Sequence, residues 1–323
     1  MKTGMSGPGV LTPGYRPFVR TALIHFSAGC GRFICENPFR KRRGKGKMTY
    51  PAWIEIDLKR LVSNARLIRE SMSVKHKVMA VVKADAYGHG AAAVVRSLRS
   101  YVDYFAVADI FEALDLRREG INDPVLVMGN CLPEGFDQAI QRNVTVTISS
   151  LPNAEILNEI ASRLGRPARV HVKVDTGMGR LGLPYRKAYE SILKMTTLPY
   201  LDIEGIYTHF SNAEEAISAF PEKQVDLFDC LLDELERHDV TFPLIHVANS
   251  AGILRGTRAK KINMIRPGLM LYGYGFEGWR AWSRDLAPVM SVKTRLMAVK
   301  DVESGKGISY GRTLYYETEN PHR

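Results

Sequence analysis

The chain has 323 residues, 45% of them hydrophobic and 24% charged, which is enough for one large domain with a second, smaller piece. Its apolar runs, such as 78–82 and 102–108, are much shorter than the ~20 residues that cross a bilayer, so we expect a soluble protein with no membrane span. The net charge of +11 is concentrated in residues 1–47, which contain ten basic residues and one acidic residue, against 35 basic and 33 acidic residues in the remainder. Because nucleic-acid binding needs a clustered excess of positive charge, we expect no nucleic-acid partner for the main body.

The four cysteines, Cys30, Cys35, Cys131 and Cys230, are too few and too scattered to form a disulfide framework. Their pattern favours a reducing compartment, and we expect a cytoplasmic location. Cys30 and Cys35 lack the CxxC spacing and the neighbouring histidines of a zinc site, so no metal site is predicted.

Residues 1–47 are rich in Gly, Pro, Arg and Lys, show no sustained period and end in a basic run over 40–47. This composition predicts a disordered basic leader. An organelle transit peptide and a nuclear signal are two interpretations of it. We favour a third interpretation: because well-patterned sequence begins at Met48, residues 1–47 are upstream sequence read through from an earlier start.

From Met48 onward, short β-branched runs alternate with longer amphipathic stretches, which is typical of βαβ units with a parallel sheet. The predicted strands are 78–83, 104–109, 125–129, 144–148, 170–175, 204–210, 245–249 and 263–268. The predicted helices are 91–100, 112–120, 151–164, 187–196 and 222–238. Eight such units over about 240 residues predict an α/β fold, a TIM (β/α)8 barrel, over residues 48–285.

The pattern changes in residues 286–323, where a long β-type run over 289–302 is followed by a glycine-bounded stretch over 305–311. This segment predicts the beginning of an incomplete all-β C-terminal domain. A few strands cannot bury their own faces, so we expect them to lie against the barrel, against residues 53–57 or against a partner chain. The chain is therefore expected to be truncated at its C-terminus.

Polar residues follow several of the predicted barrel strands, where the chemistry of a TIM barrel is located. These candidates are Lys83, Lys173, Asp175, His209, Asn249, Ser250 and Arg266. Polar side chains are common at barrel mouths, but their convergence from five strands favours a site. Lys83 closes an apolar strand, and its amine could form a Schiff base with a carbonyl compound.

The stretch VVKADAYGHG at 81–90 resembles the pyridoxal-phosphate attachment motif of alanine racemases. Five further stretches resemble that family in the family's own order. They are HVKVDTGMGRLG at 171–182, YTHF at 207–210, HVANSA at 246–251, IRPG at 265–268 and ISYG at 308–311. The resemblance covers residues 48–323 and leaves only the leader outside it.

The resemblance implies that Lys83 binds pyridoxal 5'-phosphate and that L- and D-alanine are interconverted by two bases. Lys83 would act on one face of the substrate Cα and Tyr310 on the other, because a single base would mostly restore the original configuration. His209 and Arg266 would tune the Tyr310 phenol. In this family the arginine that matches Arg266 faces the pyridine nitrogen. A guanidinium keeps its protons, so the ring would be a weaker electron sink and transamination would be suppressed.

The resemblance also implies binding roles for residues around the barrel mouth. The implied cofactor-binding residues are Lys83, Tyr87, His209, Asn249, Ser250, Arg266, Gly268 and Leu269. Arg180 would contact the substrate carboxylate or position Tyr310, and Lys173 would be carbamylated and orient Arg180. We interpret Asp175 as a structural partner of that network, and His89 and His246 as residues that shape loops.

In this family the matching tyrosine reaches the active site of the neighbouring subunit, so the resemblance implies a homodimer in which Tyr310 acts in its partner's site. The product D-alanine would supply cell-wall peptidoglycan. The family's β-domain continues with a Gly-Tyr-Ala-Asp-Gly stretch and a Cys-Met-Asp stretch that this sequence lacks. Two alternatives therefore stay open: a truncated barrel that binds the cofactor without turnover, and an amino-acid racemase of broader specificity.

Overall fold

The computed structural model describes residues 24–26, 32–35, 51–72, 76–215, 217–256, 260–275, 281–299 and 301–315. These residues belong to two compact units, a larger one built on 56–291 and a smaller one that includes segments of 33–55 and 292–315. Among the helices of this described part, none is long and apolar enough to cross a membrane. The domain boundaries predicted after residues 47 and 285 stay predictions.

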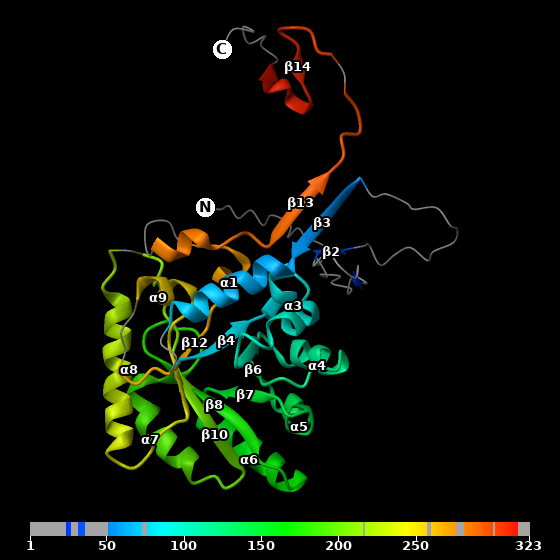
Figure 1. Ribbon diagram of the computed structural model, residues 1–323. Helices are drawn as coiled ribbons and strands as arrows, with labels where there is room; N and C mark the ends of the chain where they lie inside the picture. Colours follow the sequence, from blue (N-terminus) through cyan, green and yellow to red (C-terminus); the bar gives the residue numbers. More distant parts are fainter. Residues whose placement is uncertain are drawn as a thin grey trace, which may run out of the picture. The chain divides into compact units, whose positions relative to one another are not determined.

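Eight parallel strands close into a barrel in the larger unit, with helices on the outside (Figure 1). The order around the barrel is β10-β11-β12-β4-β5-β6-β7-β8, and parallel pairing of β8 with β10 closes it. The strands are β4 (Lys77–Val81), β5 (Tyr104–Val107), β6 (Val125–Asn130), β7 (Thr145–Ile148), β8 (Ala168–Asp175), β10 (Leu201–Tyr207), β11 (Leu244–His246) and β12 (Met264–Ile265). A short ninth strand, β9 (Leu183–Pro184), pairs with the end of β8. The predicted TIM barrel is confirmed.

The helices of the larger unit include all five that the sequence predicts. They are α1 (Leu58–Glu70), α2 (Lys83–Gly88), α3 (Ala91–Leu98), α4 (Ile110–Arg118), α5 (Phe136–Gln141), α6 (Leu151–Leu164), α7 (Tyr185–Thr196), α8 (Phe220–Glu236) and α9 (Ser250–Arg255), with 3-10 turns η1 (Pro133–Gly135), η2 (Leu269–Tyr272) and η3 (Ala281–Asp285). Helix α6 has the predicted bounds because both of its ends have capping residues. The Ser150 side chain accepts a hydrogen bond from the Asn153 N–H, and Gly165 ends the helix at φ 63°.

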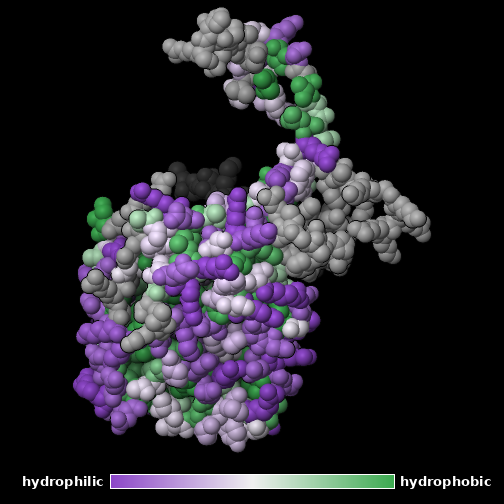
Figure 2. Space-filling model, in the orientation of Figure 1, coloured by the Kyte–Doolittle hydropathy of each residue, from purple (hydrophilic) through white to green (hydrophobic). Residues whose placement is uncertain are grey.

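Apolar side chains of both strands and helices form the core of the larger unit. Met79, Ala106 and Leu126 are among the buried residues of a hydrophobic cluster formed by the strands. Helix α8 contributes Phe228 and Leu235, which are fully buried. The face of the barrel unit seen in Figure 2 is mostly hydrophilic, with scattered hydrophobic residues. This distribution is expected for amphipathic helices that cover a central sheet.

The smaller unit contains short strands. The sheet order is β1-β2-β3-β13, with β1 (Ile24–Phe26), β2 (Arg32–Cys35), β3 (Ala52–Asp57) and β13 (Met290–Thr294), and β14 (Gly307–Ile308) pairs with β15 (Leu314–Tyr315). The 3-10 turn η4 (Tyr310–Arg312) lies between the last two strands. In the predicted leader the structure describes only the antiparallel pair β1 and β2, and the rest of 1–47 lies outside the described residues.

The prediction of one long β-type run over 289–302 is wrong. Strand β13 ends at Thr294, and the described residues 295–299 are not in a strand. The physical reason is the length of its neighbour: the last hydrogen bond of the pair joins the Arg295 N–H to the Pro51 carbonyl oxygen, one residue before β3 begins. Beyond it Leu296 and Val299 are 85% and 83% exposed.

Candidate active site

Arg266 lies directly after β12 and is the centre of a buried hydrogen-bond network at the carboxyl ends of the strands. Its Nη1 donates to His246 Nδ1 at 2.8 Å, and its Nη2 donates to His209 Nδ1 at 3.0 Å and to the carbonyl oxygens of Thr208 and Val247 at 2.9 and 3.0 Å. Burial lowers the pKa of Arg266 to about 10, so the guanidinium stays charged at neutral pH. The network therefore holds one positive charge in a fixed orientation at the barrel mouth.

His209 follows β10 and is kept neutral by its surroundings. Burial and the neighbouring cations Arg266, Lys173 and Arg180 lower the pKa of His209 to about 2. Because Nδ1 accepts the Arg266 hydrogen bond, the proton of the neutral ring is on Nε2. His209 can therefore donate one hydrogen bond from Nε2, and it cannot serve as a cationic acid at neutral pH.

Gln224 positions the His209 backbone, a role that was not predicted from the sequence. This side chain of α8 is fully buried, donates from Nε2 to the His209 carbonyl oxygen at 3.1 Å, and accepts from the Ser211 N–H at 3.1 Å. Its Nε2 also lies 3.4 Å from Thr176 Oγ1. A glutamine on the apolar face of a predicted helix was the one available signal, since a buried amide needs polar partners.

Lys173 projects from β8 and is 4% exposed, with Nζ 5.4 Å from the centre of the Tyr207 ring. Burial lowers its pKa to about 8, and the cations Arg266 and Arg180 act in the same direction while Asp175 opposes them. A substantial fraction of this amine is therefore neutral near physiological pH, which makes it nucleophilic.

The structure places Lys83 beyond its predicted strand: β4 ends at Val81, and Lys83 begins α2. Residues Ala84 to Tyr87 form a left-handed turn, with φ of 52°, 50°, 55° and 54°. Such residues cost about 1–2 kcal/mol each, which is why a pattern of apolar residues could not predict the turn. Hydrogen bonds from the Ala84 N–H to Glu112 and from the Ala91 N–H to Asp85 offset that cost, at 2.6 and 2.7 Å. The turn brings Lys83 Nζ to 5.9 Å from the centre of the Tyr87 ring.

Ser250 and Gly268 form a compact polar corner next to Tyr87. The Ser250 Oγ accepts from the N–H groups of Gly268 and Met270 at 3.0 and 3.3 Å. Its own hydroxyl proton is left to donate to an anion. A Cβ at position 268 would lie 2.9 Å from the Tyr87 hydroxyl oxygen, so a larger residue there would force the Tyr87 side chain to shift.

Asn249 and Leu269, the other predicted binding residues of this region, occupy a helix cap and a turn. The Asn249 Oδ1 accepts from the Gly252 N–H at 2.9 Å and caps α9. Leu269 begins η2 and is 42% exposed. The predicted strands over 245–249 and 263–268 thus end early, at His246 and Ile265, because the chain enters α9 and η2 within a few residues.

Arg180 and Tyr310 are exposed, whereas Arg266 and Lys173 are buried. Arg180 is exposed in the loop after β8, where Asp175 accepts from the N–H groups of Gly177 and Gly179 at 2.9 and 3.1 Å. Asp175 therefore shapes the loop that carries Arg180. Tyr310 belongs to the smaller unit, and it is 99% exposed.

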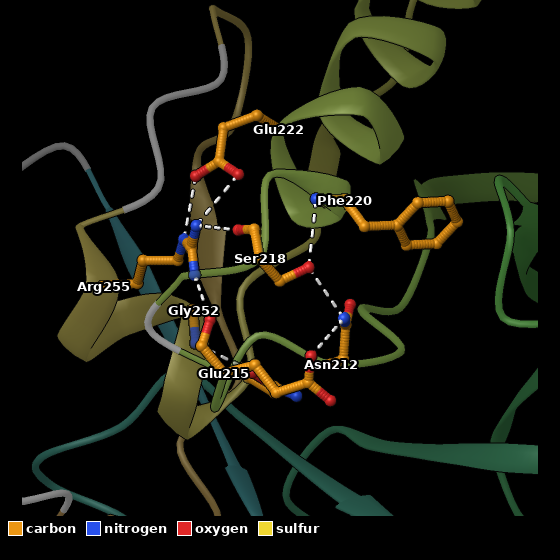
Figure 3. Close-up of polar contacts among 8 residues, drawn as sticks. Asn212, Glu215, Ser218, Phe220, Glu222, Gly252 and Arg255 are labelled. Atoms are coloured by element: carbon orange, nitrogen blue, oxygen red, sulfur yellow. Dashed lines mark hydrogen bonds and ion pairs between the residues drawn. The ribbon is translucent and has the colours of Figure 1, made fainter.

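Arg255, at the end of α9, forms hydrogen bonds that hold the loop after His209 in place (Figure 3). Its guanidinium makes two bonds to Glu222, at 2.8 and 3.0 Å, and donates to the carbonyl oxygens of Glu215, at 2.9 Å, and Ser218. Asn212 donates to Ser218 Oγ at 2.8 Å within the same loop. The helix that carries Ser250 is thereby tied to the loop after β10.

Comparison with known proteins gives consistent matches. Residues 56–275 match the family model of the alanine racemase N-terminal domain. The chain is 40% identical over 270 residues to the alanine racemase of Methanococcus maripaludis, covering 83% of this chain and 72% of that protein. An alanine racemase of Clostridium difficile 630 superposes with a TM-score of 0.76 at 38% identity, covering 84% and 71% of the two chains. The Bacillus anthracis enzyme with bound L-Ala-P gives 0.71 at 32% identity, covering 85% and 72%.

Proposed function

Because the chain belongs to the alanine racemase family, we propose that it interconverts L- and D-alanine with pyridoxal phosphate as its cofactor. The observation that carries the proposal is the buried, fully oriented Arg266 at the mouth of the barrel that also carries Lys83. Supply of D-alanine for peptidoglycan in the cytoplasm is the role that we propose for this activity.

The residues of the barrel mouth fit this cofactor. The Ser250 hydroxyl, with two N–H groups already donating to it, has its proton available for a phosphate oxygen. Tyr87 lies beside Gly268 and adds a second hydroxyl. We assign the phosphate to Ser250, Tyr87 and the backbone of 268–269, the pyridine nitrogen to Arg266, and the covalent attachment to Lys83.

Pyridoxal phosphate, when bound, supplies the electron sink that acidifies the Cα proton of the amino acid. Arg266 tunes that sink: its guanidinium keeps its charge and its protons at neutral pH, so it donates a hydrogen bond without transferring a proton. Lys83 Nζ and the Tyr310 hydroxyl remove and return the proton on opposite faces. Arg180 is exposed, and we assign it to the alanine carboxylate.

Gly268→Ala is expected to weaken cofactor binding. The new methyl group would meet the Tyr87 hydroxyl oxygen at 2.9 Å, and such overpacking costs about 1–3 kcal/mol, which corresponds to roughly 5- to 150-fold in the Kd of pyridoxal phosphate. Titration by cofactor fluorescence measures it. Combining the change with Tyr87→Phe removes the close contact, so the two losses should be less than additive. Strictly additive losses would contradict the crowding argument.

Lys173 is proposed to carry a carbamate, formed when its neutral amine attacks CO2 and releases one proton. Because the pKa of Lys173 is lowered to about 8, the neutral amine and hence the carbamate should increase as the pH rises through 8 and diminish below it. A carbamate carbon signal in 13C-bicarbonate NMR measures this. The signal should vanish in Lys173→Met and persist in Lys187→Met, an exposed lysine of α7. A signal that Lys173→Met leaves in place would refute the assignment.

We propose a homodimer in which the exposed Tyr310 of one subunit serves the site of the other. The proposed organisation is a leader over 1–47, a cofactor-binding barrel over 48–285 and the beginning of a β-domain over 286–323. A second candidate function, cofactor binding without turnover, is favoured by the exposed apolar residues Val292, Leu296, Met297 and Val299.

One experiment separates the two functions: D-alanine formation from L-alanine by this chain, supplied with pyridoxal phosphate, at several protein concentrations. Activity that rises faster than linearly with concentration supports a racemase that works as a dimer. Visible absorbance of the bound cofactor without any D-alanine would favour the binding-only chain.

A further inference from the structure

A row of polar side chains continues from Arg266 into the barrel interior. Arg266 contacts His246 of β11, His246 contacts His171 of β8, and His171 faces Glu204 of β10. We call these four residues the polar row. Both histidines are fully buried, whereas the Glu204 side chain is 23% exposed. From the sequence, Glu204 is predicted only as the first residue of a strand, with no functional role.

The donors along the polar row follow from chemistry. Arginine can only donate, so His246 Nδ1 accepts its bond at 2.8 Å and the His246 proton is on Nε2. That Nε2–H donates to His171 Nδ1, also at 2.8 Å, so the His171 proton is on Nε2 as well. Burial lowers the pKa values of both rings, which keeps both of them neutral, as this assignment requires.

The Nε2–H of His171 is the open end of the row. It is buried and has no hydrogen-bond partner within the part of the chain that the structure describes. The Glu204 Oε2 atom lies 3.6 Å away, and the same oxygen accepts from the Tyr104 hydroxyl at 2.8 Å. Burial opposes ionisation of Glu204, but the nearby His171 ring and the Tyr104 hydrogen bond bring the pKa of Glu204 below its usual value. An ionised carboxylate can only accept, so it selects the Nε2–H form of His171.

We propose that Glu204 is a positioning residue for the proposed racemase: through His171 and His246 it fixes a lone pair on His246 Nδ1 and thereby holds Arg266 in the orientation that faces the cofactor. If His171 were protonated on Nδ1 instead, two N–H groups would oppose each other between the histidines. His246 would then have to place its proton toward Arg266. Two N–H groups that face each other repel, so either arrangement would displace the Arg266 guanidinium.

The test is 15N NMR of the full chain with pyridoxal phosphate and 15N-labelled histidine, the two signals being assigned with His171→Gln and His246→Gln. We expect both rings of the unmodified chain to be neutral with the proton on Nε2. Glu204→Gln offers an amide N–H in place of the carboxylate, so a population of His171 with its proton on Nδ1 should appear. Tyr104→Phe is the matched control: it removes the Tyr104 hydrogen bond to Glu204 but keeps the carboxylate beside His171, so both tautomers should stay unchanged.

Turnover provides a second readout that depends on the proposed function. Glu204→Gln should lower kcat on the order of tenfold, the scale of loss when an orienting partner is removed, and leave the KM for alanine nearly unchanged. His171 with its proton on Nδ1 in the unmodified chain, or tautomers that Glu204→Gln does not change, would overturn the inference. The spectrum of the unmodified chain decides even if the variant fails to fold. Absence of racemisation in the unmodified chain would refute the proposed function alone, since the tautomers are measured without turnover.

Discussion

Replacing Lys83 with alanine is expected to lower racemisation by more than about 10³-fold, because the amine both attaches the cofactor and transfers a proton. The visible absorbance of covalently bound pyridoxal phosphate should disappear with the activity. Lys83 is the first residue of α2, and the hydrogen bonds that hold the left-handed turn come from other residues. The fold should therefore survive the change. Initial rates with L-alanine, absorbance spectra and circular dichroism measure the three effects.

Lys187→Ala is the matched control for this loss, because Lys187 is an exposed lysine on α7. It should leave turnover and the spectrum unchanged. Unaltered turnover in Lys83→Ala would remove Lys83 from the mechanism. Lost turnover with an unaltered absorbance band would place the attachment point at another amine.

The barrel was predictable because its signals are local and repeated. The strands are short apolar runs, several of them rich in β-branched residues as in Val170–Val174, and helices such as α6 carry their own capping residues at Ser150 and Gly165. The features that could not be predicted from the sequence depend on tertiary context. The turn at Ala84–Tyr87 has a backbone conformation that its residue types disfavour, and the β-type run over 289–302 ends where its neighbouring strand begins.

Residues of the candidate site were predictable where polar or ionisable side chains lie at the ends of barrel strands. Lys173, His209, Ser250 and Arg266 were found in this way, and the structure joins His209 to Arg266 in one hydrogen-bond network. The supporting residues were missed. Gln224, Arg255 and Glu204 act through partners that are remote in sequence, and a single polar residue inside a helix or strand does not reveal its partner.

Tyr310→Phe is expected to lower the rate of L-alanine racemisation by about 10²–10⁴-fold, since it removes the hydroxyl that exchanges a proton on one face of the substrate. Cofactor affinity should change little, because no phosphate contact is assigned to Tyr310. Rates in both directions and a titration with pyridoxal phosphate measure the two effects. Equal loss of turnover and of cofactor binding would indicate a structural role for the side chain.

Mixing this variant with Lys83→Ala tests whether Tyr310 acts in its partner's site. In a mixed dimer one site would combine the intact Lys83 of one subunit with the intact Tyr310 of the other, while the second site would lack both. Random exchange of subunits should then restore roughly a quarter of the unmodified specific activity from two inactive proteins, since half of the dimers are mixed and each has one complete site. If Tyr310 served its own barrel, neither subunit of a mixed dimer would have a complete site, and mixing would restore nothing.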